Sequence, residues 1–382
     1  MNLINFSNQL AAGPKNISLN FIKEILSSGK DEMYIFLVPS IVEYQVFKDT
    51  QNVKFLFVEV GTGFIGKILK TLRINWWIIP KICRTETIES ILAFGNFLTY
   101  SSGAIKKVVL LHHPHIVDDE LFYSLPISSK ISESVKRLVF WLTIRNVDIV
   151  VVQSDYMLDQ CYRKFPKYHS KFTIIHNPIS RDFESNLSVQ ANNLKRAGFK
   201  NKDKFTLLYV SRFYPHKNHE FLIDLSKKFL ESSLKIEILV TIDPLLEGAN
   251  NFLESVNSQK LPIYNLNELS QQELAQYYVS ADFMIFPSIA ETFGNPIIEA
   301  LFFSLPLILP NRGYAKALLG EGGAYYDPVS VDSCFHLLKT LIKNEESYIR
   351  YAEYCYSRSL VFPNSSRWVH LFKGLLRGSC EA

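Results

Sequence analysis

The chain has 382 residues, a formal net charge of +4 and 47% hydrophobic residues. This is the composition of a folded protein and excludes an intrinsically disordered chain. Because single hydrophobic cores stop growing near about 250–300 residues, the length favours two domains. So small a net charge does not support nucleic-acid binding through bulk charge, and we expect no nucleic-acid partner.

The first residues, MNLINFSNQLAAGPKN, lack the basic and apolar regions of a signal peptide. No apolar run reaches the roughly 20 residues of a membrane-spanning helix. The five cysteines are an odd number and contain no CxxC pair. Such thiols are typical of a reduced compartment, and their spacing gives no zinc site. We therefore expect a cytoplasmic protein.

Short apolar runs alternate with segments of helical period, and we interpret the runs as buried parallel strands. In the first half, strands are expected at the N-terminus and at 33–38, 53–60, 108–111, 147–152 and 172–175. A polar stretch at 185–204 interrupts the pattern. In the second half, strands are expected at 205–210, 235–240, 282–286, 306–309 and 324–326.

This alternation predicts right-handed parallel crossovers. We therefore expect an α/β protein of two Rossmann-like, doubly wound parallel-sheet domains that face each other across a cleft, with ligands beyond the carboxyl ends of the strands. The expected parts are an N-terminal domain at 1–180, a linker at 181–204, a C-terminal domain at 205–360, and a closing helix at 361–382 that packs back towards the N-terminal domain.

A glycine-rich segment follows the strand expected at 53–60. Gly61, Gly63 and Gly66 fit the GxGxxG fingerprint of dinucleotide-binding proteins. That fingerprint belongs after the first strand, with an acidic residue ending the next strand, and neither condition holds here. A tight strand-to-helix turn is the favoured interpretation, and an NAD-dependent oxidoreductase remains the alternative.

The segment 287–300, PSIAETFGNPIIEA, follows the strand expected at 282–286. Asn295 suits the cap of a helix and Pro296 its first position, where a missing N–H costs nothing. Free amides around Gly294 and Asn295 then mark a helix start, whose dipole favours an anion by roughly 0.3–1 kcal/mol. A diphosphate would therefore need cationic side chains as well.

Two carboxylates accompany this helix start. Glu291 precedes the helix because Gly294 and Pro296 interrupt it, whereas Glu299 lies one turn inside. Glu299 can accept two hydrogen bonds from ribose hydroxyls, and Glu291 can meet the hydroxyls of a group beyond the phosphates. For either glutamate alone, a place on a solvated helix face stays open.

Cationic side chains follow the first strand of the second half, in the loop SRFYPHKN at 211–218. Arg212 offers a planar fork for phosphate oxygens, and Lys217 offers a point charge. Together they would neutralise a departing diphosphate without a metal ion. Taken singly, each could also be a surface charge that caps a helix. No Asp-rich metal site is recognisable, so we expect neither a metal nor a cofactor.

The segments SRFYPHKN and PSIAETFGNPIIEA together resemble the motifs of the GT-B-fold, retaining glycosyltransferases of family four. The two glutamates match the family's E-x7-E motif. The resemblance is specific over 205–328, which includes GGAYYDP. It is looser in the first half, where VVVQSDYM and IIHNPI look like the family's last strands before the crossover between the domains.

The resemblance implies that the second domain binds a nucleotide-sugar donor. It places Arg212 and Lys217 on the diphosphate, Glu299 on the ribose and Glu291 on the transferred sugar. These roles would make Glu291, Arg212 and Lys217 catalytic residues and Glu299 a substrate-binding residue. We expect front-face substitution with retention, since no nucleophilic carboxylate on the opposite face can be named.

Main-chain contacts are implied by the same resemblance. The backbone amides of Phe293, Gly294 and Asn295 would join the phosphate and sugar contacts. The segment 263–266 resembles the one that lines the base, which leaves UDP, GDP and dTDP open. Asn218 stands where many relatives have glycine.

The first domain should bind the acceptor, and here the chain departs from the family pattern. Many relatives carry a doubled glycine after the first strand, whereas this chain has Gly13 alone, in AAGP. His112, His113 and His115 close the strand at 108–111, where the family has a histidine near the transferred sugar. The register favours His112 as catalytic, with Gly13 and His113 as substrate-binding candidates. Otherwise, a histidine at the end of a strand most often has a structural role and makes its hydrogen bonds within the protein.

Apolar residues at helical spacing after the glycine-rich segment are typical of a helix that lies on an anionic membrane surface. They are Ile65, Ile68, Leu69, Leu72 and Trp76, accompanied by Trp77 and by Lys67, Lys70, Arg73, Lys81 and Arg84. A core-facing amphipathic helix is the alternative. The membrane interpretation fits a polyprenyl-diphosphate-linked glycan acceptor of bacterial surface polysaccharide synthesis, used by a peripheral enzyme on the cytoplasmic face.

Two further alternatives belong to other functional classes. A GT-B-fold epimerase would share the fold and the nucleotide site. A non-catalytic nucleotide-binding module would bind the same ligand without turnover.

Overall fold

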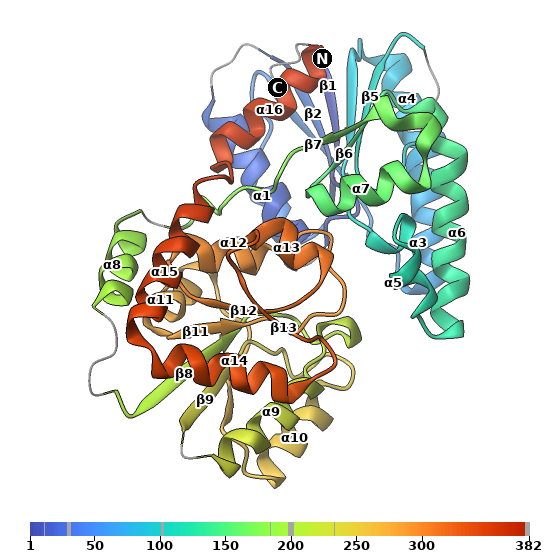
Figure 1. Cartoon of the computed structure of the whole chain (residues 1–382). Coiled ribbons are helices and arrows are strands. Elements are labelled where there is room, and N and C mark those ends of the chain that lie inside the picture. Colours follow the sequence, from blue (N-terminus) through green and yellow to red (C-terminus); the bar gives the residue numbers. More distant parts are fainter. Residues whose placement is uncertain are drawn as a thin grey trace. The chain divides into compact units, whose positions relative to one another are not determined.

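The computed structural model describes residues 1–10, 12–28, 32–100, 103–183, 185–197, 202–232 and 234–378. The chain folds into two compact units (Figure 1). The first unit contains Met1–Asn177 and the C-terminal segment from Ser365, and the second contains Pro178–Asn364. The chain thus leaves the first unit once and returns to it for its last helix.

The first unit is built on a parallel sheet with the strand order β3-β2-β1-β4-β5-β6-β7 within the described ranges. The strands are β1 (Asn2–Asn5), β2 (Tyr34–Pro39), β3 (Val53–Val58), β4 (Ser90–Ala93), β5 (Lys106–Leu110), β6 (Ile149–Val152) and β7 (Phe172–Ile174). Leu3 of β1 lies in register with Ile35 of β2 on one side and Ile91 of β4 on the other. The sequence analysis had not identified β4, although all four of its residues are buried.

Helices cover both faces of this sheet. The α-helices are α1 (Ala12–Ser27), α2 (Val42–Gln45), α3 (Gly63–Arg73), α4 (Ile79–Thr85), α5 (Asp119–Tyr123), α6 (Ile127–Thr143), α7 (Asp155–Lys164) and α16 (Ser365–Arg377). Shorter helical turns of other types are the π-helical η1 (Ile74–Ile78) and the 3-10 turns η2 (Pro114–Ile116), η3 (Ile144–Asn146) and η4 (Pro166–Lys171). Residues of η1, α4, α6 and α7 share one core cluster with the sheet. Residues of α1 and α16 share the cluster on the opposite face.

The closing helix α16 is fixed by aromatic packing. Trp368 is fully buried, and its ring meets that of Phe21 of α1 edge-on at 5.5 Å. Phe372 lies 5.6 Å from Phe94, which follows β4. Figure 1 shows α16 (red) beside α1 (blue). The last helix of the chain is therefore a structural part of the first unit.

The second unit has a parallel sheet with the strand order β10-β9-β8-β11-β12-β13 over the described residues. The strands are β8 (Lys204–Tyr209), β9 (Lys235–Val240), β10 (Ile263–Asn265), β11 (Phe283–Ile285), β12 (Leu307–Pro310) and β13 (Ala324–Tyr326). The helical segments are α8 (Ser185–Arg196), η5 (Pro215–Lys217), α9 (Glu220–Glu231), α10 (Ala249–Ser258), α11 (Gln271–Ser280), α12 (Asn295–Phe302), α13 (Gly313–Leu319), α14 (Val331–Lys343) and α15 (Glu345–Ser359). The expectation of two doubly wound α/β sheets is confirmed.

The segment expected to be a linker differs from that expectation. Most of 185–197 forms α8, which packs on α11 and α15 of the second unit. Ala191 is fully buried there, and the ammonium of the buried Lys195 donates hydrogen bonds to the carbonyl oxygens of Val279 and Ala281 at the end of α11. Its polar composition reflects these carbonyl contacts and an outward helix face. Residues 184 and 198–201 of the expected linker lie outside the described residues.

The glycine-rich segment forms a tight turn between β3 and α3, as its structural interpretation predicts. Gly63 has a φ of +65° at the start of α3, and a Cβ on Gly66 would lie 3.4 Å from the Gly61 backbone. Because β3 is an edge strand, this turn does not follow the central strand β1, after which dinucleotides bind. The arrangement argues against the NAD-dependent alternative.

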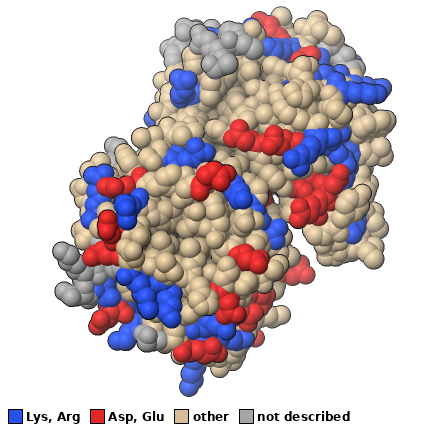
Figure 2. Space-filling view, in the orientation of Figure 1, with Lys and Arg blue, Asp and Glu red and all other residues tan. Residues whose placement is uncertain are grey.

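Charged side chains are mixed on the surface that Figure 2 displays. Basic and acidic groups alternate and are separated by wide uncharged areas. This distribution agrees with the small net charge of +4.

Candidate functional site

The candidate residues of the second unit follow two adjacent strands at the point where the strand order reverses. From β8 the chain continues to β9 on one side, and from β11 it continues to β12 on the other. Ligands of open α/β sheets bind beyond the carboxyl ends of strands at such a switch point. Arg212 and Lys217 follow β8, whereas Glu291 and the start of α12 follow β11. The topology thus places both predicted segments at the position that the fold favours for a ligand.

The loops after β8 and β11 are joined by hydrogen bonds. The backbone N–H of Ile289 donates to the carbonyl oxygen of His216 at 2.7 Å, and the Ser288 hydroxyl donates to the same oxygen at 3.1 Å. The Tyr209 hydroxyl donates to the carbonyl oxygen of Lys217 at 2.6 Å. Asn218 has a φ of +55°, a left-handed conformation that glycine and asparagine adopt most readily. This conformation accounts for asparagine at a position where related sequences have glycine.

Lys217 and Glu291 form an ion pair across these two loops. Their side chains are only 16% and 11% exposed, so both charges are largely removed from water. The Lys217 ammonium also lies 5.3 Å from the centre of the Phe286 ring. The pairing brings together a cation predicted for the diphosphate and a carboxylate predicted for the transferred sugar. Each charge neutralises the other in the protein without ligand.

The start of α12 lies one residue earlier than predicted. Gly294 caps the helix with a φ of +89°, Asn295 is its first residue and Pro296 occupies the next position. A side chain on Gly294 would be strained by this φ, and its Cβ would lie 3.0 Å from Ile297. Phe293 is 1% exposed and packs edge-on against Phe362 at 5.8 Å. Phe293 can therefore offer a ligand its backbone and not its ring.

Glu299 is buried inside α12. Its side chain accepts a hydrogen bond of 2.8 Å from the Tyr278 hydroxyl of α11. Burial raises the pKa of Glu299 to about 7, and the hydrogen bond from Tyr278 opposes this rise only in part. Tyr278 is held in turn by the Phe303 ring, which stacks on it at 5.4 Å. The sequence analysis did not identify Tyr278, because nothing in its local pattern marks a partner 21 residues away.

Arg212 has an acidic neighbour that the sequence analysis also missed. Its guanidinium lies 3.5 Å from Glu268, which follows β10. The Arg212 Nε is buried and makes no hydrogen bond to any described residue. Asn265, the last residue of β10, is tied to the loop after β9, because its side chain accepts from the Ile242 N–H and donates to the Ile242 carbonyl oxygen, both at 2.9 Å. The segment predicted to line the base therefore ends next to a partner of Arg212.

The candidate His112 of the first unit follows β5. Its backbone N–H donates to the Asn96 side chain at 2.7 Å, and its ring lies 5.9 Å from that of Phe94. Burial lowers the pKa of His112 to about 4, which the neighbouring Gln153 only partly opposes. His112 is therefore neutral at physiological pH and can act as a hydrogen-bonding group.

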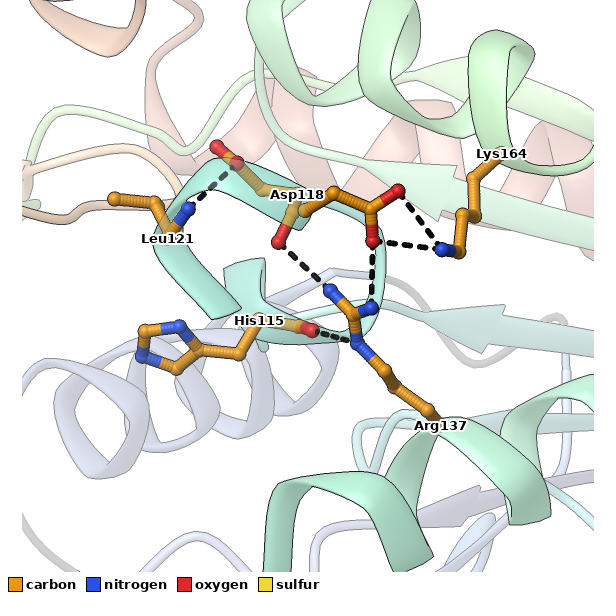
Figure 3. Close-up of polar contacts among 6 residues, drawn as sticks. His115, Asp118, Leu121, Arg137 and Lys164 are labelled. Carbon is orange, nitrogen blue, oxygen red and sulfur yellow. Dashed lines mark hydrogen bonds and ion pairs between the residues drawn. The ribbon is translucent and has the colours of Figure 1, made fainter. Parts of the chain in front are cut away.

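The other two histidines belong to the segment 113–119, which we call the histidine loop. The ring nitrogens of His113 lie 3.2 Å from the Lys136 ammonium and 3.7 Å from Glu133 on α6. Burial lowers the pKa of His115. Arg137 of α6 holds this loop by donating to the carbonyl oxygen of His115 at 2.6 Å (Figure 3).

The remaining contacts of Arg137 complete the network in Figure 3. Its guanidinium donates to the Asp118 carbonyl oxygen at 2.8 Å and to the Asp119 carboxylate at 2.6 Å. Asp119 also accepts from Lys164, while the Asp118 side chain caps α5 at the Leu121 N–H. The loop that carries the histidines is thus fixed from α6 and α7.

Gly13 is the second residue of α1 and is half-buried. The preceding loop is held by the Tyr44 hydroxyl, which donates to the Gln9 carbonyl oxygen at 2.9 Å, and by Lys70, which donates to that of Ser7 at 3.2 Å. This loop follows β1 and the Asn96 turn follows β4, and these adjacent strands flank the switch point of the first sheet. Gly13 and His112 are thus placed near the corresponding edge of the first unit.

The residues that the structure describes contain no group of three or more His, Cys, Asp or Glu side chains that could hold a metal ion. No helix in the same ranges is long and apolar enough to cross a membrane.

Comparison with known proteins connects this geometry to a family. Residues 190–358 match the family model described as glycosyl transferases group 1. A 41.2 kDa protein in the cps region of Klebsiella pneumoniae is 20% identical over 67% of the chain and 66% of that protein, just under two thirds of its length. The N-acetylgalactosamine-N,N'-diacetylbacillosaminyl-diphospho-undecaprenol 4-alpha-N-acetylgalactosaminyltransferase of Campylobacter jejuni is 23% identical over 87% of the chain and 88% of that enzyme.

A solved structure shares the fold. The structure of HepE from Anabaena in complex with UDP-glucose superposes with a TM-score of 0.70 at 15% identity, over 99% of each chain. The matched residues of the family model include both loops of the candidate donor site. The chain therefore has the GT-B fold of two parallel-sheet α/β units, and its residues 190–358 are similar to the group 1 glycosyltransferases.

Proposed function

We propose that the protein is a retaining, metal-independent hexosyltransferase that moves a sugar from a nucleoside-diphosphate-sugar donor to a polyprenyl-diphosphate-linked glycan. The observation that carries this proposal is the Lys217–Glu291 ion pair beside the start of α12, at the switch point of the second sheet. A buried cation, a carboxylate and a helix start at one sheet edge provide what a diphosphate and a sugar need.

Donor binding divides these groups between the parts of the ligand. Arg212 and Lys217 meet the diphosphate oxygens, together with the backbone at Gly294 and Asn295. Lys217 then turns from Glu291 to the phosphate, which releases the Glu291 carboxylate for sugar hydroxyls. Glu299 accepts hydrogen bonds from the ribose. The ion pair of the free protein is in this way exchanged for two ligand contacts of matching charge.

The reaction breaks the bond between the anomeric carbon and the diphosphate oxygen. Lys217 and Arg212 stabilise the negative charge that develops on that oxygen. The acceptor hydroxyl bonds to the same face of the sugar, and its proton passes to the departing phosphate oxygen. We assign the neutral His112 a contact with the transferred sugar, and we give Gly13 and His113 substrate-binding roles.

Two observations support a lipid-linked acceptor in bacterial surface polysaccharide synthesis at the cytoplasmic face of the membrane. The Campylobacter relative acts on a diphospho-undecaprenol-linked glycan by name, and the Klebsiella relative belongs to the cps region. In the segment 63–85, Leu69, Leu72 and both tryptophans are 37–77% exposed, so that its apolar groups do not all face the core. The side chains of Ile65, Lys67 and Ile68 lie outside the described residues.

The direct test combines ligand binding with turnover. Thermal unfolding of the purified protein is followed with UDP, GDP or dTDP, and a ligand at 100 times its dissociation constant adds about 2.7 kcal/mol of stability. We expect one of the three to stabilise the protein, and Glu299→Ala to abolish the effect. Turnover is then measured as the incorporation of labelled sugar into a polyprenyl-diphosphate-linked glycan, with EDTA present to remove metal ions. NMR of the product gives its anomeric configuration.

The outcomes separate the competing functions. Stabilisation by NAD that is lost in Gly63→Val would support the oxidoreductase. Nucleoside diphosphate binding without transfer to any acceptor would support a binding module, and epimerised donor would support an epimerase. Loss of transfer in EDTA or an inverted product would contradict the proposed mechanism.

A further inference from the structure

Helix α6 carries an apolar stripe on its exposed face. The stripe consists of Ile127, Ile131, Val135, Leu138, Trp141 and Leu142, whose side chains are between 44% and 81% exposed. Their positions repeat every three or four residues, which places them on one side of the helix. At 1.5 Å per residue the stripe is about 22 Å long. A soluble surface rarely exposes so continuous a row of large apolar side chains.

The same helix is firmly built on its other side. Phe140 is 1% exposed in the core, and Arg137 and Glu133 are engaged with the histidine loop. The exposed stripe is thus distinct from the side of α6 that packs on the rest of the first unit. It is a second apolar face, opposite a face already used for packing.

Basic residues prevail within α6 itself and in the segment 63–85, although α5, which contacts α6, carries Asp119 and Glu120. Glu133 is the only acidic residue of α6, and it is buried and paired with Lys136 at 2.6 Å. Arg145 is exposed just beyond the helix end. The neighbouring segment 63–85 contains five Lys or Arg residues and no Asp or Glu. Residues of η1, α4 and α6 belong to the core cluster on one face of the first sheet, so the two basic segments cover the same face.

Tryptophan placement points to the same kind of partner. Three of the four tryptophans, Trp76, Trp77 and Trp141, are 58–77% exposed on these two segments, whereas Trp368 is buried. Exposed tryptophans flanked by basic residues are typical of surfaces that settle into the headgroup region of a bilayer. The basic residues complement anionic lipid, at about 1 kcal/mol for each one near the surface.

We propose that the outward face of α6 is the principal docking surface of the protein on an anionic lipid bilayer, with Trp76 and Trp77 as a second contact on the same face of the first sheet. The inference deepens the proposed function, because a lipid-linked acceptor is presented at such a bilayer. The biological role of the docking surface rests on the proposed function, but its existence is tested independently, since lipid binding and nucleotide binding are measured separately.

The test is co-sedimentation of the full chain with vesicles of phosphatidylcholine, alone or with phosphatidylglycerol. We expect the wild type to bind the anionic vesicles and the triple variant Ile131→Ser, Leu138→Ser and Trp141→Ser to bind at least about tenfold more weakly. A matched control replaces three exposed apolar residues of the second unit, Leu245, Val329 and Leu360, by serine and should bind like the wild type. Nucleotide-induced thermal stabilisation, which depends on the second unit, should survive in both variants.

A second measurement avoids the triple substitution. In Trp76→Phe/Trp77→Phe, Trp141 is the remaining exposed tryptophan, and vesicles of brominated lipid should quench its fluorescence while the buried Trp368 stays unquenched. An unquenched Trp141, or equal vesicle binding by the wild type and the α6 variant, would overturn the proposal. So would a concentration-dependent dimer in sedimentation velocity that the α6 variant abolishes, because a second copy would then be the occupant.

Discussion

The Tyr278 hydroxyl donates a 2.8 Å hydrogen bond to the Glu299 carboxylate, and both side chains are buried between α11 and α12. Burial raises the pKa of Glu299 to about 7, and this hydrogen bond is what lowers it towards the ordinary value. The carboxylate proposed to hold the ribose is therefore only partly ionised near neutral pH. The hydrogen bond from Tyr278 therefore influences how much of this carboxylate is ionised and, with it, the affinity for the ligand.

Tyr278→Phe should move the pH dependence of nucleotide binding to higher pH. Ribose binding uses the ionised carboxylate, so affinity of the wild type should fall as the pH drops through about 7. Loss of the hydrogen bond from Tyr278 should destabilise the ionised Glu299 carboxylate by about 1.5 kcal/mol. This shifts the midpoint of the pH dependence upward by about one pH unit. Calorimetric titration of the stabilising nucleotide between pH 6 and pH 9 measures the midpoint.

Tyr277→Phe is the matched control, because Tyr277 is the adjacent half-buried tyrosine of the same helix. It should leave the midpoint unchanged. His112 does not complicate the profile, since its pKa of about 4 keeps it neutral over this range. A midpoint that is the same in Tyr278→Phe and the wild type would remove Tyr278 from this role.

Glu299→Gln should stabilise the free protein at high pH. The pKa of Glu299 is raised from 4.5 to about 7 on folding, so the native state holds this proton more tightly than the unfolded chain. The stability that this provides is fully present below pH 4.5 and is lost as the pH rises through 7. Ionising the buried group costs about 3 kcal/mol, which the neutral amide avoids.

The measurement is urea unfolding of Glu299→Gln and the wild type at pH 5 and pH 8.5 without nucleotide. We expect the variant to gain stability relative to the wild type between the two pH values. The same variant should bind the nucleotide more weakly, because the amide has one uncharged acceptor oxygen in place of the two charged oxygens of a carboxylate. Equal pH dependence of the two proteins would contradict a raised pKa at this position.

The Lys217–Glu291 pair predicts a difference between stability and activity in a double-mutant cycle. Lys217→Met or Glu291→Gln leaves one largely buried group without its partner and should cost about 1–3 kcal/mol of stability. The double variant should recover most of that loss. Transfer activity should stay at least about 100-fold below the wild type in all three, since each group also contacts the donor. Recovery of activity in the double variant would mean that the pair is structural only.

Much of the fold could be predicted because buried parallel strands have continuous apolar sequences. The strands at β2, β3, β8 and β9 were found in this way. Strands β7, β11 and β13 have only three residues each and were predicted from apolar runs, whereas β4 and β10 were missed. Their positions are set by pairing with β1, β5 and β9, which is information from distant parts of the chain.

The candidate site was predictable where its chemistry is local. SRFYPHKN and PSIAETFGNPIIEA each place their groups within one loop and the helix after it, so the spacing carries the geometry. The partners of those groups were not predictable, since Tyr278 and Glu268 come from other elements of the second unit. The same holds for Arg137, which holds the histidine loop of the first unit from α6. Helix α8 was missed for the same reason, because its buried Lys195 donates hydrogen bonds to carbonyl oxygens more than 80 residues away.

Arg137 provides the final prediction, because it holds the histidine loop by three hydrogen bonds and stacks on Phe122 at 3.8 Å. Lysine keeps the charge but not the planar fork, so Arg137→Lys should lose about 2–3 kcal/mol of stability in the first unit. Lys164→Met, which removes the other and more exposed partner of Asp119, should cost less than about 1 kcal/mol. Because the donor groups belong to the second unit, nucleotide affinity of Arg137→Lys should equal that of the wild type while transfer falls about tenfold or more. A loss of nucleotide affinity that parallels the loss of transfer would show that Arg137 acts on the whole protein and not on the position of His112 and His115.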